Sequence, residues 1–125
     1  IQRILLTMKL LFVYNAEKDF FNGAIDYAHK VFKPSTYKCD LCALIYHNLG
    51  QRSAWKKFKE ATNADLSFYY IKGFEKKFNE SYDYPVVIMR DNRQNTVILN
   101  QQDLSEFDTI EDLILRMEAI VKSSN

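Results

Sequence analysis

The sequence predicts a single α/β domain in which helices cover both faces of a small mixed sheet of about four strands. Apolar runs rich in strand-forming residues alternate with segments of helical periodicity, and the last two runs flank one short polar turn. The length of 125 residues, with 47% hydrophobic and 26% charged residues, is typical of one soluble globular unit. We therefore expect residues 1–125 to form one domain.

The first part of the chain contains one apolar run and one amphipathic segment. Residues 9–15, KLLFVYN, form a continuous apolar run, which indicates a central strand covered on both faces. In residues 19–32, DFFNGAIDYAHKVF, apolar positions repeat at helical spacing. Pro34 ends this predicted helix, because proline disfavours helical geometry in the residue before it.

Two short helices are predicted next. Cys39 precedes a helix that extends from Asp40 to about His47, and residues 48–50, Asn-Leu-Gly, are typical of a helix end. Ser53 is then predicted to cap a helix over residues 54–62, AWKKFKEAT.

A strand, a helix and a hairpin follow. Residues 66–72, LSFYYIK, indicate a second strand, and Gly73 leads into a short helix over residues 74–80. Residues 85–89 and 96–100 flank the polar turn RDNRQN, which predicts two antiparallel strands.

The last element is predicted to be a helix. Asp108 and Glu111 have the spacing of a capping box at its start. Its apolar positions form the most regular helical stripe in the chain: Ile110, Leu113, Ile114, Met117, Ile120 and Val121.

This order of elements is that of the thioredoxin fold in its minimal, glutaredoxin-like form. Tyr84-Pro85 lies at the entrance to the third strand, where that fold has a cis-proline. Proline is disfavoured inside a strand, and cis geometry is nearly confined to bonds that precede proline. We therefore expect a cis Tyr84-Pro85 bond.

The stretch YNAEKDFFNGAIDYAHK, followed by YKCDLCALIY and a later W..F, resembles a family of small uncharacterised bacterial thioredoxin-like proteins with a Tyr-x-Cys-x-Leu-Cys-Ala-Leu segment. The resemblance covers residues 9 to about 60 well. It implies the fold and a role for Cys39 and Cys42, but no established activity. Some members carry a GTPase label. The three glycines, at positions 23, 50 and 73, form neither a P-loop nor a GxGxxG motif, so GTPase activity and dinucleotide binding are not expected.

The two cysteines, Cys39 and Cys42, have the spacing of a redox pair. In such a pair one thiolate attacks a disulfide and the second resolves the mixed disulfide. A cysteine at a helix N-terminus has a stabilised thiolate, so Cys39 is the predicted nucleophile and Cys42 the resolving thiol. The alternative is that both are small buried residues of the core, where cysteine is common.

Three features depart from thioredoxin. Asp40 and Leu41 separate the cysteines, and the charge of Asp40 is expected to raise the thiol pKa. The position after the first strand, NAEK, has no cysteine. The pair follows a complete helix, which carries the chain about 21 Å away. Residues 33–38 can span at most about 20 Å, just enough to return Cys39 to the level of Pro85.

Metal binding is a second hypothesis. Cys39, Cys42 and His47 form a Cys-x2-Cys-x4-His pattern, a ligand set that zinc accepts. A closed structural site needs a fourth ligand, and only His29 or Asp40 is near in sequence. The signal is weak without a second cysteine pair, so we predict no metal ligand and no cofactor.

A non-catalytic binding module on the same fold is a third hypothesis. The rim of the cleft beside a cis-proline would collect Tyr14, Asn15, Glu17, Tyr84 and Pro85. Exposed aromatic residues often anchor partners. Most aromatic residues of this chain, however, lie on faces that the core needs.

Charge and targeting signals limit the partners and the location. The net charge of +1 gives no reason to expect nucleic acid, and the apolar N-terminus is too short and too charged to span a membrane. Without an export signal, we expect a cytoplasmic, reducing environment. Met8-Lys9 resembles a natural start, so residues 1–7 are a candidate upstream extension. The expected partner is a protein or small-molecule thiol or disulfide. The oligomeric state is not predicted.

Overall fold

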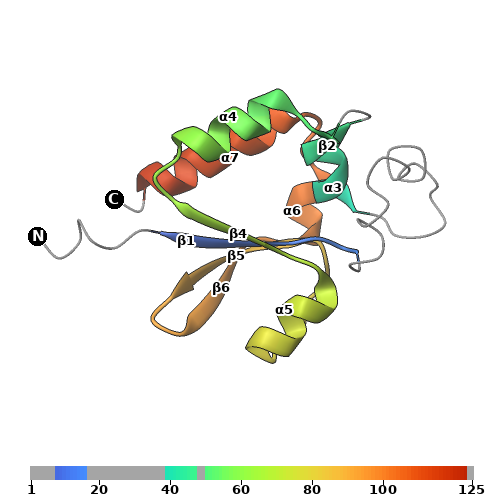
Figure 1. Ribbon diagram of the computed structural model, residues 1–125, viewed down its shortest axis with the longest axis vertical. Helices are drawn as coiled ribbons and strands as arrows, with labels where there is room; N and C mark the ends of the chain where they lie inside the picture. The colour runs from blue at the N-terminus through green and yellow to red at the C-terminus, as the bar shows by residue number, and fades with distance from the viewer. Residues whose placement is uncertain (1–7, 17–38, 48–49, 124–125) are drawn as a thin grey trace, which may run out of the picture.

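The structure is a computed structural model that describes residues 8–16, 39–47 and 50–123. Its centre is a mixed sheet of four strands in the order β4-β1-β5-β6 (Figure 1). These strands are β1 (Lys9–Val13), β4 (Asp65–Tyr69), β5 (Val86–Asp91) and β6 (Gln94–Leu99). Strand β1 is parallel to β4 and antiparallel to β5, and β6 is antiparallel to β5. The predicted α/β class and four-stranded mixed sheet are confirmed.

Helices cover both faces of this sheet (Figure 1). On one face lie α3 (Asp40–Ile45), α4 (Ser53–Ala61), α6 (Gln101–Ser105) and α7 (Ile110–Ser123). On the other lies α5 (Ile71–Phe78). The short strands β2 (Tyr46–His47) and β3 (Gly50–Gln51) form a separate two-stranded sheet. The helix predicted for residues 19–32 lies outside the described residues.

Strand β1 has the continuous apolar sequence that its position requires. Residues 10–13 have no exposed surface. Leu10 and Phe12 pack with α3, α4 and α7 on one face, whereas Leu11 and Val13 pack with Phe74 of α5 on the other. A central strand between two helical layers is buried on both sides, and this favours an unbroken apolar run over an alternating one.

The cysteine helix is shorter than predicted. It ends at Ile45 because Tyr46 is extended, with φ −107° and ψ 148°, and begins strand β2. The predicted helix end at residues 48–50 is therefore wrong. Gly50 starts β3 with φ +104°, a conformation that glycine adopts without the steric cost of a Cβ atom.

Other boundaries shift by a few residues. The N-cap of α4 is Arg52 instead of Ser53, and α5 begins at Ile71, so that Gly73 lies inside the helix. At the start of α7, Thr109 and Asp112 cap each other's backbone N–H groups, at 3.2 Å in both directions. The predicted pair, Asp108 and Glu111, is thus displaced by one residue.

The hairpin and the proline agree with the sequence prediction. Strands β5 and β6 belong to the same sheet, and the Tyr84-Pro85 peptide bond immediately before β5 is cis. Within the described part of the chain, no helix has both the length and the apolar character that crossing a membrane requires.

Candidate functional site

The two cysteines lie where the chain returns to the end of β1. Cys39 is the N-cap of α3, in extended geometry, and its Sγ accepts a hydrogen bond from the backbone N–H of Cys42 at 3.2 Å. The same Sγ accepts a second hydrogen bond, at 3.4 Å, from the backbone N–H of Asn15. Asn15 follows β1 by two residues. The Cys39 sulfur therefore links the end of the central strand to the start of α3.

Cys39 and Cys42 form a disulfide, with their Cα atoms 5.2 Å apart. Cys39 is 8% exposed, whereas Cys42 is completely buried. Leu41 and Ile45 anchor α3 in the core and so hold Cys42 inside. Both cysteines are thus buried, and Cys39 retains a small exposed fraction that Cys42 lacks.

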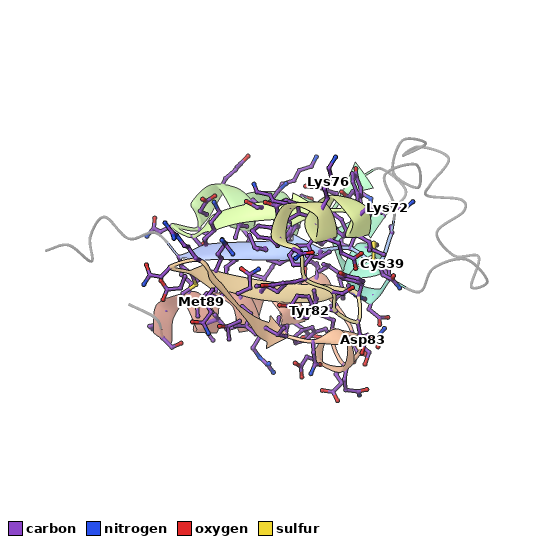
Figure 2. The ribbon with its side chains drawn as sticks, turned by 90° about the horizontal axis from the view of Figure 1, so that it is seen from below. Cys39, Lys72, Lys76, Tyr82, Asp83 and Met89 are labelled. Atoms are coloured by element: carbon purple, nitrogen blue, oxygen red, sulfur yellow. A yellow bond between two sulfur atoms is a disulfide. The ribbon has the colours of Figure 1, made fainter. Side chains whose placement is uncertain are left out.

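The disulfide and the cis bond lie at the same end of the sheet. Val13, the last residue of β1, pairs with Val86, which follows Pro85 directly. Asn15, two residues beyond Val13, donates to Cys39. The sequence allowed Cys39 to return to this end of the sheet without requiring it, and the structure places it there, although no cysteine directly follows the first strand. In Figure 2, Cys39 lies at the same end of the molecule as Lys72 and Asp83.

Tyr14 and Asn15, two of the predicted rim residues, lie beside the pair. The Tyr14 ring is buried in the same apolar cluster as both cysteines. It lies 6.2 Å from the Phe68 ring and 6.5 Å from the Tyr70 ring, measured between centroids. Burial, with a smaller contribution from Tyr46, raises the pKa of Tyr70. These aromatic rings belong to, or pack against, the buried cluster that contains the two cysteines.

Tyr84 belongs to the opposite face of the sheet. Its ring packs with Phe74 in the α5 cluster, and its hydroxyl donates to Glu75 Oε2 at 2.7 Å. Burial and this hydrogen bond raise the pKa of Tyr84 to about 12. Hydrogen bonds from Ser81 and Tyr84 lower the pKa of Glu75. The Tyr84 ring is therefore separated from the cysteines by the sheet, and Pro85 is itself buried immediately before β5. Glu17 lies outside the described residues.

Gln101 is a residue of this region that sequence reasoning missed. Its side-chain amide donates to the carbonyl oxygen of Tyr84 at 2.8 Å, next to the cis bond. It lies at the first position of α6, after a capping box formed by Asn100 and Asp103. The Asn-x-x-Asp spacing directly after β6 is the signal that could have identified this helix start.

The residues considered for metal binding are only partly described. Cys39 and Cys42 are joined to each other, His47 lies on β2, and His29 lies outside the described residues. Over residues 8–16, 39–47 and 50–123, no three His, Cys, Asp or Glu side chains form a group that could hold a metal ion.

A separate cleft of about 410 Å³ lies between α3, α4 and α7. Its lining includes the side chains of His47, Arg52, Asp108 and Glu111, so charges of both signs face it. Arg52 donates to the carbonyl oxygens of Leu44 and Ala43, which ties the cleft wall to the end of α3. Neither cysteine lines this cleft.

Comparisons with known proteins give no match. Neither the models of known protein families, nor curated protein sequences, nor solved structures include one that matches this chain. The function proposed for the site depends on its geometry and on the sequence.

Proposed function

We propose that the chain is a thioredoxin-like protein of the glutaredoxin type and that Cys39 and Cys42 exchange between dithiol and disulfide. The strand order β4-β1-β5-β6, the cis Tyr84-Pro85 bond and the helices on both faces support this fold. The reaction partner is a protein or small-molecule thiol or disulfide.

The observation that carries the redox proposal is the arrangement of the two sulfur atoms. Cys39 is buried but for 8% of its surface and accepts two backbone N–H hydrogen bonds, whereas Cys42, one helical turn further on, is completely buried. N–H groups directed at a sulfur stabilise its thiolate, which is the nucleophilic form. Cys39 is therefore the attacking thiol and Cys42 the resolving thiol.

Reduction of a substrate disulfide by the cysteine pair takes two steps. The Cys39 thiolate attacks one sulfur of a substrate disulfide; a Cys39–substrate disulfide forms, the substrate bond breaks, and the leaving thiolate takes up a proton. The Cys42 thiol loses its proton, and its thiolate attacks Cys39 Sγ. The second substrate thiolate is released, and two electrons have passed from the cysteine pair to the substrate. With a substrate dithiol, the same steps run in reverse.

A purely structural role for this disulfide is less favourable. Its residues are three apart in sequence, so the bond closes a very short loop. In the chain-entropy account, stabilisation grows with loop length and amounts to only about 2 kcal/mol for so short a loop. The surrounding core already holds both residues in place, because most of their surface is buried.

The test measures free thiols in the native protein after equilibration in glutathione buffers of graded potential. We expect both thiols to appear together in a single two-electron transition while the fold is retained. Iodoacetamide should then label Cys39 well below the ordinary cysteine pKa of about 8.5. Cys39→Ser should abolish disulfide reductase activity, and Cys42→Ser should trap a mixed disulfide on Cys39.

Two outcomes would replace the redox proposal. If neither thiol reacts until the protein unfolds, the cysteines are core residues. If zinc at equimolar concentration protects both thiols of the reduced protein from iodoacetamide, the pair is part of a metal site.

A further inference from the structure

We infer that the backbone N–H of Asn15 is a positioning group for the Cys39 thiolate and that it favours the reduced state of the pair. This inference rests on the proposed function, because it concerns the same two sulfurs. It goes further, since it assigns part of the thiolate's stabilisation to the end of β1, outside the Cys-x-x-Cys segment.

Two backbone N–H groups donate to Cys39 Sγ, and they come from different parts of the chain. The Cys42 N–H, at 3.2 Å, belongs to the helix that Cys39 caps and follows from the spacing of the motif. The Asn15 N–H, at 3.4 Å, comes from a residue 24 positions away in sequence. Both distances are within the range of hydrogen bonds to sulfur, which is larger than oxygen.

The position of Asn15 is fixed by its neighbours. The N–H of Tyr14 donates to the carbonyl of Tyr69 at 3.0 Å, and the carbonyl of Ala16 accepts from the N–H of Ile71 at 3.1 Å. The chain is thus held to β4 and α5 on both sides of Asn15. The N–H of Asn15 is presented to Cys39 at little further cost in conformational entropy.

The hydrogen bond matters more to the reduced pair than to the disulfide. A thiolate carries a full negative charge, and hydrogen bonds to ionised groups are roughly twice as strong as those between neutral groups. The charge of Asp40, which follows Cys39 directly, opposes the thiolate. Donation from Asn15 therefore counters the repulsion from Asp40 and shifts the exchange towards the dithiol.

The test compares Asn15→Pro, which removes the N–H, with Asn15→Ala, which keeps it. Both are made in the wild-type pair and in a Cys42→Ser background that isolates the Cys39 thiol. In Cys42→Ser, the iodoacetamide rate against pH should show a Cys39 titration about one unit higher for Asn15→Pro than for Asn15→Ala. With the pair intact, the equilibrium with glutathione should move about tenfold towards the disulfide.

A second variant keeps the test valid if Asn15→Pro does not fold. A synthetic segment of residues 1–38, in which an ester replaces the peptide bond between Tyr14 and Asn15, can be joined to a segment that begins with Cys39. The ligation leaves the native side chains, and an ester oxygen takes the place of the Asn15 N–H. The ester protein should show the same two shifts, and its thermal unfolding should confirm that it is folded.

The outcomes separate this inference from the proposed function. If the folded ester protein titrates and equilibrates like the wild type, the role of Asn15 is disproved while the redox pair stands. If Asn15→Ala shifts as much as the ester protein, the side chain of Asn15 is responsible and the inference also fails. If the wild-type pair never exchanges with glutathione in the folded state, the proposed function itself fails.

Discussion

The two faces of the sheet are held together in different ways. The face that carries the cysteines is filled by apolar packing around Trp55, whose ring lies 5.5 Å from Phe12 and 5.3 Å from Phe58. The α5 face is filled by aromatic rings whose hydroxyls are directed to carboxylates, as in the hydrogen bond from Tyr84 to Glu75. Side-chain packing thus stabilises the cysteine face. On the α5 face, oriented hydrogen bonds to carboxylates add to the packing.

This difference explains where an exchangeable bond can lie. On the cysteine face, the backbone N–H groups of Asn15 and Cys42 donate to Cys39 Sγ. On the α5 face, Tyr82 and Tyr84 both donate to carboxylates of Glu80 and Glu75. We expect these donors to stay in place when the disulfide opens, because backbone hydrogen bonds of Tyr14 and Ala16 hold the chain on both sides of Asn15, and Cys42 lies within α3.

The largest effect is expected at the centre of the cysteine face. Trp55→Ala should lower the free energy of unfolding by about 3–5 kcal/mol, because the side chain is fully buried and leaves a cavity. Trp55→Phe should cost much less, since Trp55 Nε1 is buried without a hydrogen-bond partner among the described residues. Urea unfolding of both variants measures the difference. Equal losses would show that the indole N–H makes a favourable interaction.

The next effect is a loss of stability at alkaline pH that comes from the α5 face. Burial raises the pKa of Tyr82 and Tyr84 to about 12 in the folded protein, with hydrogen bonds to Glu80 and Glu75 adding to the shift. An unfolded tyrosine loses its proton near pH 10, so above that pH the unfolded state becomes more stable relative to the folded state. The stability contributed by each phenol is complete below about pH 10 and is lost towards pH 12.

Tyr84→Phe isolates one of these phenols. The variant should lose less stability than the wild type as the pH rises from about 9 to about 11, measured by urea unfolding at each pH. Tyr82→Phe is the matched comparison on the same face. If neither variant changes the slope, the phenols titrate normally and the hydroxyls are not held as described.

The smallest effect is expected where the two faces meet. Gln101→Ala removes the hydrogen bond to the Tyr84 carbonyl and should cost about 0.5–1.5 kcal/mol. Gln102→Ala is the control, because the exposed Gln102 side chain bonds only weakly to Glu106, at 3.2 Å. Thermal unfolding compares the two. Equal losses in both variants would mean that helix propensity accounts for the effect and that Gln101 does not connect the faces.

Local sequence patterns were sufficient to predict the four-stranded sheet. The apolar run of β1, the polar turn between β5 and β6, and proline at the start of β5 each have one dominant physical meaning, and all three predictions are confirmed. The short elements were harder. Residues 48–50 have the composition of a helix end, but pairing of Tyr46 with Gln51 produces a hairpin that no local pattern indicates.

The candidate site was predictable only where its features are local in sequence. The spacing of Cys39 and Cys42 and the helix that begins at Asp40 could be deduced, because both are local. The hydrogen bond from Asn15 could not, since it joins residues far apart in sequence through a backbone group that every residue carries. The orientation of Tyr84 away from the cysteines depends on Glu75 of α5, a partner that the sequence does not identify.

The register of β1 has a consequence for biosynthesis. Lys9 pairs with Asp65 on one side and with Arg90 on the other, so both neighbours of the central strand come from the second half of the chain. A ribosome releases β1 before β4 and β5, so the apolar residues of β1 lack these two sheet partners until β4 and β5 have emerged. Such distant pairings slow folding and leave apolar surface open to association meanwhile. Association of the nascent chain is therefore most favoured in the interval after β1 has emerged and before β4 can pair with it.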